Sequence, residues 1–129
     1  MLKAYYNKNA SDMIENTLKL DLQPIYERFE KYLKHGSKLL DVGFGSGRDS
    51  LHFYAKGFDV VSIDFAEEVY NRGKNLLNTE VLLVDFQEMR YHNEFDSIWA
   101  SAVLLHYSNQ EIIQIMNRFK NALKDQGMI

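Results

Sequence analysis

Three of the seven glycines, Gly43, Gly45 and Gly47, lie within five residues, directly after the apolar-rich run KLLDV at residues 38–42. A helical pattern, RDSLHFYAKG, begins with Arg48. A strand that enters a glycine turn and restarts as a helix directs several backbone N–H groups, and the positive end of the helix dipole, toward one place. The stretch therefore predicts a strand–turn–helix unit that binds a ligand with negative or polar groups.

Strand and helix patterns alternate along the remainder of the chain. Strands are predicted at residues 38–42, 58–64, 80–85 and 95–103, and helices at 22–33, 48–57, 66–77 and 108–127. Such alternation implies right-handed crossovers and a parallel sheet covered by helices on both faces. We expect one α/β domain over residues 1–129, a Rossmann-like doubly wound sheet with an N-terminal helical cap at residues 1–36.

The final helix is predicted to open with the capping box SNQE at residues 108–111 and to end at Gly127. Its apolar residues recur at helical spacing, so we expect them, together with Trp99, to belong to the core. The expected inner face consists of Ile112, Ile113, Ile115, Met116, Phe119 and Leu123.

Composition narrows the class of protein. A length of 129 residues suits one domain, and a net charge of −3 gives no general attraction to nucleic acid or anionic membranes. The chain has no cysteine, which excludes disulfides, thiolate metal sites and cysteine nucleophiles. No apolar run is long enough to span a membrane. We expect a cytoplasmic protein without a metal site.

Acidic residues end three of the predicted strands or lie near their ends. Asp41 precedes the glycines, Asp64 ends the second strand and Asp85 ends the third. In a parallel sheet these positions meet at the carboxyl edge, where ligands of this fold class bind. Asp64 could accept hydrogen bonds from both hydroxyls of a ribose, and Asp85 from an adenine amino group. Phe65 and Phe86, each next to one of these acids, could sandwich the purine.

The spacing of the glycines separates this turn from two better-known phosphate-binding turns. A dinucleotide fingerprint reads glycine, one residue, glycine, two residues, glycine, but the last of those positions is Arg48 here. A phosphate-binding P-loop requires a Lys-Ser or Lys-Thr pair after the glycines, and none follows them.

Four stretches, in this order, resemble the class I S-adenosylmethionine-dependent methyltransferases: LLDVGFGSGRD, SIDFAEE, LLVDFQEM and FDSIWASAVLLHYS. Within that family the chain is most similar to the small tellurite-resistance-type methyltransferases. The turn GSGRDS, the strand IWAS followed by LLH, and the N-terminal YYNKNA support this narrower resemblance. The resemblance covers nearly the whole chain.

The resemblance implies a role for each matching residue. Asp41 and the backbone of Gly43, Phe44, Gly45 and Gly47 would contact the methionine part of the cofactor, with the Phe44 side chain pointing away. Asp64 would hold the ribose with Phe65 against the adenine, and Asp85 and Phe86 would hold the adenine edge and face. Ser101, or the backbone beside it, would lie near the methionine carboxylate and ammonium.

Several residues have a structural alternative to a role in the site. His106 could accept a proton from a substrate or be structural, since its ordinary pKa is near 6.5. Asp85 could simply cap a helix, and Phe65 and Phe86 could be core aromatics. Arg48 and Asp49 could pair with each other and hold the turn in place.

The chain ends where the resembling family enters a fifth strand of its seven-stranded sheet. We therefore expect a sheet truncated after the fourth strand and its helix, with the fourth-strand edge exposed and available for homodimer formation. The expected function is methyl transfer from S-adenosylmethionine to a small-molecule nucleophile such as an oxyanion or a thiol. The alternative is a catalytically incomplete cofactor-binding fragment or an interaction module.

Overall fold

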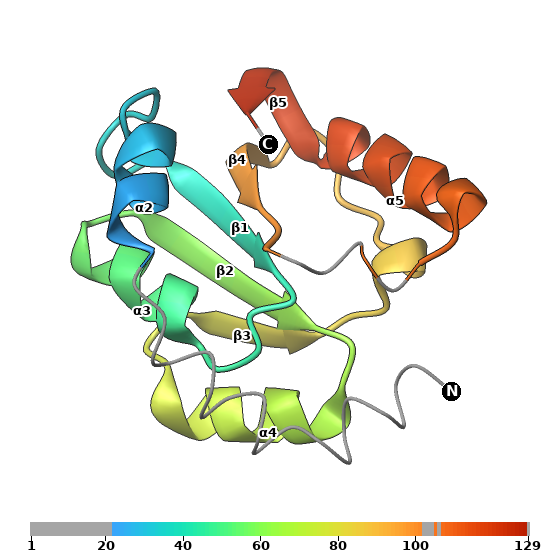
Figure 1. Cartoon of the computed structure of the whole chain (residues 1–129), viewed down its shortest axis with the longest axis horizontal. Helices are drawn as coiled ribbons and strands as arrows, with labels where there is room; N and C mark the ends of the chain where they lie inside the picture. The colour runs from blue at the N-terminus through green and yellow to red at the C-terminus, as the bar shows by residue number, and fades with distance from the viewer. Residues whose placement is uncertain (1–21, 102–104, 106, 129) are drawn as a thin grey trace.

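The computed structural model describes residues 22–101, 105 and 107–128 (Figure 1). The elements alternate along the chain as the sequence predicts. They are α2 (Gln23–Glu30), β1 (Lys38–Val42), α3 (Arg48–Ala55), β2 (Asp59–Asp64), α4 (Glu67–Leu76), β3 (Glu80–Leu83), the 3₁₀ turn η1 (Phe86–Glu88), β4 (Phe95–Trp99), α5 (Asn109–Ala122) and β5 (Leu123–Met128).

The strands form one parallel sheet in the order β3-β2-β1-β4-β5. β1 lies at its centre, with Asp41 opposite Ser62 of β2 and opposite Trp99 of β4. The strand order reverses between β2 and β4, on the two sides of β1, and ligands of doubly wound sheets bind at this kind of point. The glycine turn that follows β1 therefore lies at the topological switch point.

The expected truncation of the sheet after the fourth strand and its helix is wrong, because the structure contains a fifth strand. β5 pairs in parallel with β4, with a register shift between Phe95 and Ser97. Residues 123–128 carry too few apolar side chains to show a strand pattern, so the pairing depends on backbone hydrogen bonds that composition does not reveal. The fourth-strand edge is therefore not free, and the expected dimer through that edge loses its basis.

Helices cover both faces of the sheet. On one face, Tyr26 of α2 and Phe53 of α3 pack with Leu39, Val60 and Trp99. On the other face, Ile115 and Phe119 of α5 belong to a larger cluster that includes Leu40, Ile63 and Ile98. Alternating residues of β1 and β2 enter the two clusters, as expected for strands that are buried on both faces. Figure 1 shows α5 separated from α2 and α3 by the sheet.

The last helix ends earlier than predicted. α5 stops at Ala122, and Gly127 lies inside β5 instead of ending the helix. Ser108 and Glu111 form the predicted capping box. Ile113 is wrong as an inner-face residue, because it is 61% exposed. At about 100° per residue it lies well over a quarter-turn from the face that Ile115 and Phe119 share.

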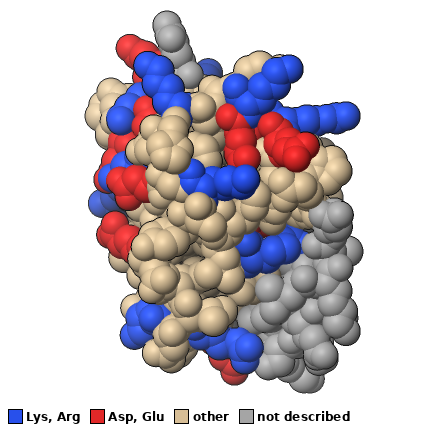
Figure 2. Space-filling view, turned by 90° about the vertical axis from the view of Figure 1, so that its left-hand side faces the viewer, with Lys and Arg blue, Asp and Glu red and all other residues tan. Residues whose placement is uncertain are grey.

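The surface that carries α2 and α3 is mixed in charge. Figure 2 shows lysine and arginine side chains interspersed with aspartate and glutamate on the described part of this face. No helix in the described ranges is both long and apolar enough to cross a membrane.

Candidate functional site at the switch point

The glycine turn is held against the end of β2. The N–H groups of Gly43 and Phe44 both donate to the carbonyl of Ile63, at 2.8 and 3.2 Å. Gly47 adopts φ +85°, and a Cβ there would come within 2.9 Å of Leu77. This position therefore requires glycine for its left-handed backbone, and a Cβ there would also displace the end of the Leu77 side chain, which directly follows α4. A Cβ at Gly45 would meet only the carbonyl oxygen of Gly43, at 4.0 Å, so the turn is open there.

Phe44 fixes the back of the turn. Its side chain is buried with Ala66, Val69 and Leu77. A Cβ at Gly73 would lie 2.5 Å from the Phe44 ring. Gly73, which weakens α4 by propensity, is thus the position where the ring contacts the helix backbone.

Asp64 is joined directly to the glycine turn. Its Oδ2 accepts from the N–H of Gly45 at 3.2 Å, and its Oδ1 accepts from the N–H of Ala66 at 3.0 Å. The residue is 5% exposed, and burial raises the pKa of its carboxyl to about 6. Backbone N–H groups of Ala66, Gly45 and Phe65 act against this rise, because they favour the charged carboxylate. A carboxylate at the end of β2 can accept a hydrogen bond from a ligand hydroxyl group.

Asp41 lies behind the turn. Its Oδ2 accepts from the Ser50 hydroxyl at 2.6 Å, and the residue is 1% exposed. Ser50 also contacts the Ser62 hydroxyl at 2.6 Å, and Ser62 contacts Thr79 at 2.8 Å. Burial, followed by the nearby charge of Asp49, raises the pKa of the Asp41 carboxyl to about 8. We call this run of four side chains the polar seam.

Asp49 organises a second buried group, which we call the Asp49 cluster: Tyr26, Arg48, Asp49 and Trp99. Asp49 accepts from the Tyr26 hydroxyl, from Arg48 Nε at 2.9 Å and from Trp99 Nε1 at 2.9 Å. The predicted pairing of Arg48 with Asp49 is confirmed. The contacts of Tyr26 and Trp99 were not predicted, because no sequence pattern indicates that α2 and β4 meet at the first turn of α3.

The aromatic sandwich predicted for the purine is wrong. The rings of Phe65 and Phe86 contact each other, with centroids 5.2 Å apart and planes inclined by 54°, so no third ring fits between them. Both rings belong to the core cluster on the α5 side, where Phe86 is fully buried and Phe65 is 8% exposed. Asp85 caps η1 by accepting from the N–H of Gln87 at 3.0 Å, and this leaves its second oxygen available. The structural alternative therefore holds for the Phe86 ring.

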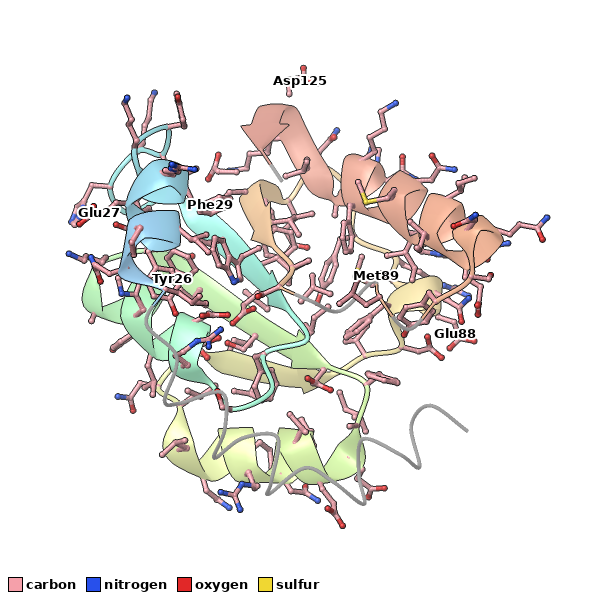
Figure 3. All side chains as sticks on the ribbon, viewed as in Figure 1. Tyr26, Glu27, Phe29, Glu88, Met89 and Asp125 are labelled. Atoms are coloured by element: carbon pink, nitrogen blue, oxygen red, sulfur yellow. The ribbon has the colours of Figure 1, made fainter. Side chains whose placement is uncertain are left out.

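Ser101 follows the end of β4 and borders a cavity of about 310 Å³, the β4 cavity, which also includes Ile25, Phe29, Ile98, Trp99 and Ala100. Figure 3 shows Tyr26 and Phe29 pointing from α2 toward the sheet and Glu27 pointing away from it. His106 lies outside the described residues. Within the described part of the chain, no three potential ligand residues gather as a metal site would require.

A family model described as a methyltransferase domain matches residues 39–127, a span that contains the glycine turn and all three acids. The chain belongs to this family. Its fold is that of the class I S-adenosylmethionine-dependent methyltransferases, as both sequence relatives and solved structures agree.

Three methyltransferases illustrate the match. "Probable S-adenosyl-L-methionine-dependent methyltransferase TehB" of Haemophilus influenzae is 28% identical over 64% of this chain and 31% of its own length. A TehB-like methyltransferase structure from Corynebacterium glutamicum has a TM-score of 0.79 and 18% identity, over 96% of this chain and 70% of its own. A Burkholderia thailandensis 1,6-didemethyltoxoflavin-N1-methyltransferase, with S-adenosylhomocysteine bound, has a TM-score of 0.82 and 18% identity, over 98% of this chain and 58% of its own.

The chain spans less than half the length of the first curated relatives that it matches, 47% and 31% respectively. The span that the family model matches reaches from β1 to β5 and contains the glycine turn and the three acids.

Proposed function

We propose that this chain binds S-adenosylmethionine at the switch point and transfers its methyl group to a small-molecule nucleophile. The hydrogen bond from Gly45 to Asp64 is the observation that carries the proposal. It makes the glycine turn and the acid at the end of β2 one connected unit at the edge of the sheet where the ligand is proposed to bind. Methyltransferase family membership supports the same assignment.

The residues present fit the cofactor. The oxygens of Asp64 would accept from the two ribose hydroxyls, and the open side of the turn at Gly45 would receive the methionine part. The ring of Phe65, and Asp85 at the start of η1, would meet the adenine. Ser101 would lie near the methionine carboxylate and ammonium. Contact of Asp41 with that ammonium stays a prediction, because the polar seam already uses one of its oxygens.

The cofactor supplies an activated sulfonium methyl group, so the protein's own contribution is mainly alignment and exclusion of water. When bound, the cofactor would supply this methyl group to a lone pair of the acceptor, and the electron pair of the C–S bond would stay with sulfur. An acceptor that carries a proton releases it to water or to a base. His106 is the base that the sequence offers for this step.

The acceptor is proposed to be a small molecule, with oxyanions, thiols and similar nucleophiles as the candidate class. The net charge of −3 disfavours a nucleic acid. A cytoplasmic location belongs to the same proposal.

Calorimetry with S-adenosylhomocysteine tests the proposal. We expect saturable binding at one site per chain, which NAD does not compete for, because the turn lacks the dinucleotide spacing. A methyl-transfer assay then separates an enzyme from a binding fragment that lacks turnover. Absence of saturable binding would overturn the proposed function.

A further inference from the structure

The glycine turn depends on the segments on its two sides for a fixed position. Its three glycines, at positions 43, 45 and 47, all have positive φ angles, and a chain so rich in glycine has little local preference for one conformation. On one side, β1 is held inside the sheet. On the other side, α3 begins at Gly47, where the N-cap position supplies no side-chain hydrogen bond. Contacts that fix the first turn of α3 therefore also fix the glycine turn.

Asp49, in the first turn of α3, is where two other elements contact this segment. Its Oδ1 accepts from the hydroxyl of Tyr26 in α2, and its Oδ2 accepts from the indole N–H of Trp99 in β4 at 2.9 Å. Arg48 donates to the same carboxylate from the neighbouring position. Asp49 is 6% exposed, so water replaces a lost donor poorly. The Asp49 cluster thus joins the start of α3 to α2 and β4.

Tyr26 is the donor that comes from outside the sheet and outside the turn. Burial, and then its contact with Asp49, raises the pKa of its hydroxyl, so the hydroxyl keeps its proton and donates. The Tyr26 ring stacks on His52 of α3, with centroids 3.8 Å apart and planes inclined by 13°. Glu30, one turn further along α2, lies 2.5 Å from His52 Nε2. These contacts align α2 with α3, and the Tyr26 hydroxyl is directed at the residue next to the start of the helix.

We propose that Tyr26 is a positioning residue for S-adenosylmethionine: its hydroxyl, acting through Asp49, holds the glycine turn in the position that binds the ligand. This rests on the proposed function and adds to it a residue of α2 that acts without contacting the ligand. Without the hydroxyl, the first turn of α3 samples other positions. The apparent Kd then rises in inverse proportion to the fraction of molecules whose turn is in the binding position.

Tyr26→Phe tests the hydroxyl alone, because it keeps the ring that stacks on His52 and packs beside Trp99. Calorimetry with S-adenosylhomocysteine, at a temperature at which the variant is folded, is expected to show an affinity about tenfold below that of the parent chain. A residue with a purely structural role would lower the free energy of unfolding and leave the affinity of the folded molecules unchanged.

Phe58→Leu is the matched control. Phe58 belongs to the same apolar cluster as Tyr26, but it directly precedes β2, at the opposite end of that strand from Asp64. It packs edge to face against Phe53 and has no group that could donate to Asp49. We expect Phe58→Leu to lower the melting temperature and to bind S-adenosylhomocysteine with the parent's affinity.

Amide hydrogen exchange of the ligand-free chain gives a second readout. The N–H of Gly47 donates to the Phe44 carbonyl, and the N–H of Leu51 donates to the Gly47 carbonyl, both at 2.8 Å. Local opening of these two bonds reports on the glycine turn and the start of α3. We expect Tyr26→Phe to accelerate exchange at both amides relative to the amides of β1. Phe58→Leu should leave that ratio as it is in the parent chain.

Three results would overturn the inference while leaving the proposed function intact. They are parent-like S-adenosylhomocysteine affinity in Tyr26→Phe, an equal loss of affinity in Tyr26→Phe and Phe58→Leu, and an unchanged exchange ratio in Tyr26→Phe. Failure of the parent chain itself to bind S-adenosylhomocysteine would instead reject the proposed function, and the positioning role with it.

Discussion

At the scale of single residues, the two buried acids of the switch point have separate tasks. Asp64 faces the open side of the glycine turn, and both of its oxygens are already oriented by backbone N–H groups. Asp41 is enclosed on the other side and bonded to Ser50. Both were chosen from the sequence as ligand contacts on the same grounds, their place near a strand end. Only their hydrogen-bond partners in the structure distinguish the role of Asp64 from that of Asp41.

Replacing Asp64 with asparagine tests its role. Asp64→Asn removes the charge that two ribose hydroxyls would bond, and each such bond contributes about 1.5–3 kcal/mol. The amide keeps one acceptor oxygen, but its NH2 group would face one of the two backbone N–H donors, so we expect S-adenosylhomocysteine affinity to fall by at least about 10- to 100-fold by calorimetry. Asp59→Asn, at the exposed start of the same strand, is the control and should change nothing. Equal affinities in the two variants would reject the ribose assignment.

The pH dependence of the free energy of unfolding should reveal the raised pKa of Asp41. Its pKa is raised to about 8 in the folded chain, above its value of 3.8 as a free side chain. The folded state therefore holds a proton that the unfolded state has lost, and the free energy of unfolding falls as pH rises between these two values. Asp41→Asn removes this contribution but keeps an acceptor for Ser50.

Urea unfolding across that pH interval measures the effect. We expect the stability of Asp41→Asn relative to the parent chain to increase steadily with pH, up to about pH 8. Asp59→Asn again serves as the comparison. A difference between Asp41→Asn and the parent that does not vary with pH would show that Asp41 titrates normally.

At the scale of elements, the contact between Phe44 and α4 explains why α4 contains Gly73, a residue that helix propensity disfavours. Gly73→Ala should favour the helix by about 1 kcal/mol in isolation. Here the new methyl would lie within 2.5 Å of the Phe44 ring, so the ring and the turn that carries it must move. We expect Gly73→Ala to lower both thermal stability and S-adenosylhomocysteine affinity.

Asn71→Ala on the same helix is the matched variant. Asn71 is exposed, and alanine is the better helix former by a few tenths of a kcal/mol or more. We expect a small gain in melting temperature and no change in affinity. If Gly73→Ala behaved like Asn71→Ala, the packing of Phe44 would not be what fixes the turn.

The regular elements were predictable because their signals are local. The alternation of apolar runs located four strands, and SNQE located the start of α5, where Ser108 and Glu111 cap each other. β5 was missed, since the polar run LKDQGM has no such pattern and is recruited by the edge of β4. The Asp49 cluster was missed for a related reason. Tyr26 and Trp99 converge on Asp49 only after the sheet has formed.

At the scale of the whole molecule, ligand binding should stabilise the domain as a unit. The proposed contacts come from the ends of β1, β2, β3 and β4, which adjoin one another in the sheet. A ligand present at about 100 times its Kd adds about 2.7 kcal/mol to the free energy of unfolding. For a domain of this size, this corresponds to a rise in melting temperature of about 10 °C.

Differential scanning fluorimetry with increasing S-adenosylhomocysteine measures this rise, and NAD at the same concentrations is the comparison. A rise with NAD equal to that with S-adenosylhomocysteine would contradict the specificity of the turn.

The polar seam has a consequence for how the strands find one another during folding. Asp41 and Ser62 are direct partners in the alignment of β1 with β2, and Ser50 bridges them from α3. A slip of β2 by one residue would turn Ser62 toward the α5 core and bring Val61 or Ile63 to face the carboxyl group. The Ser62 hydroxyl would then be buried among apolar side chains without a hydrogen-bond partner, and the hydrogen bonds around the Asp41 carboxyl would be disrupted. The four polar side chains therefore favour the observed register of β1 and β2 over registers shifted by one residue.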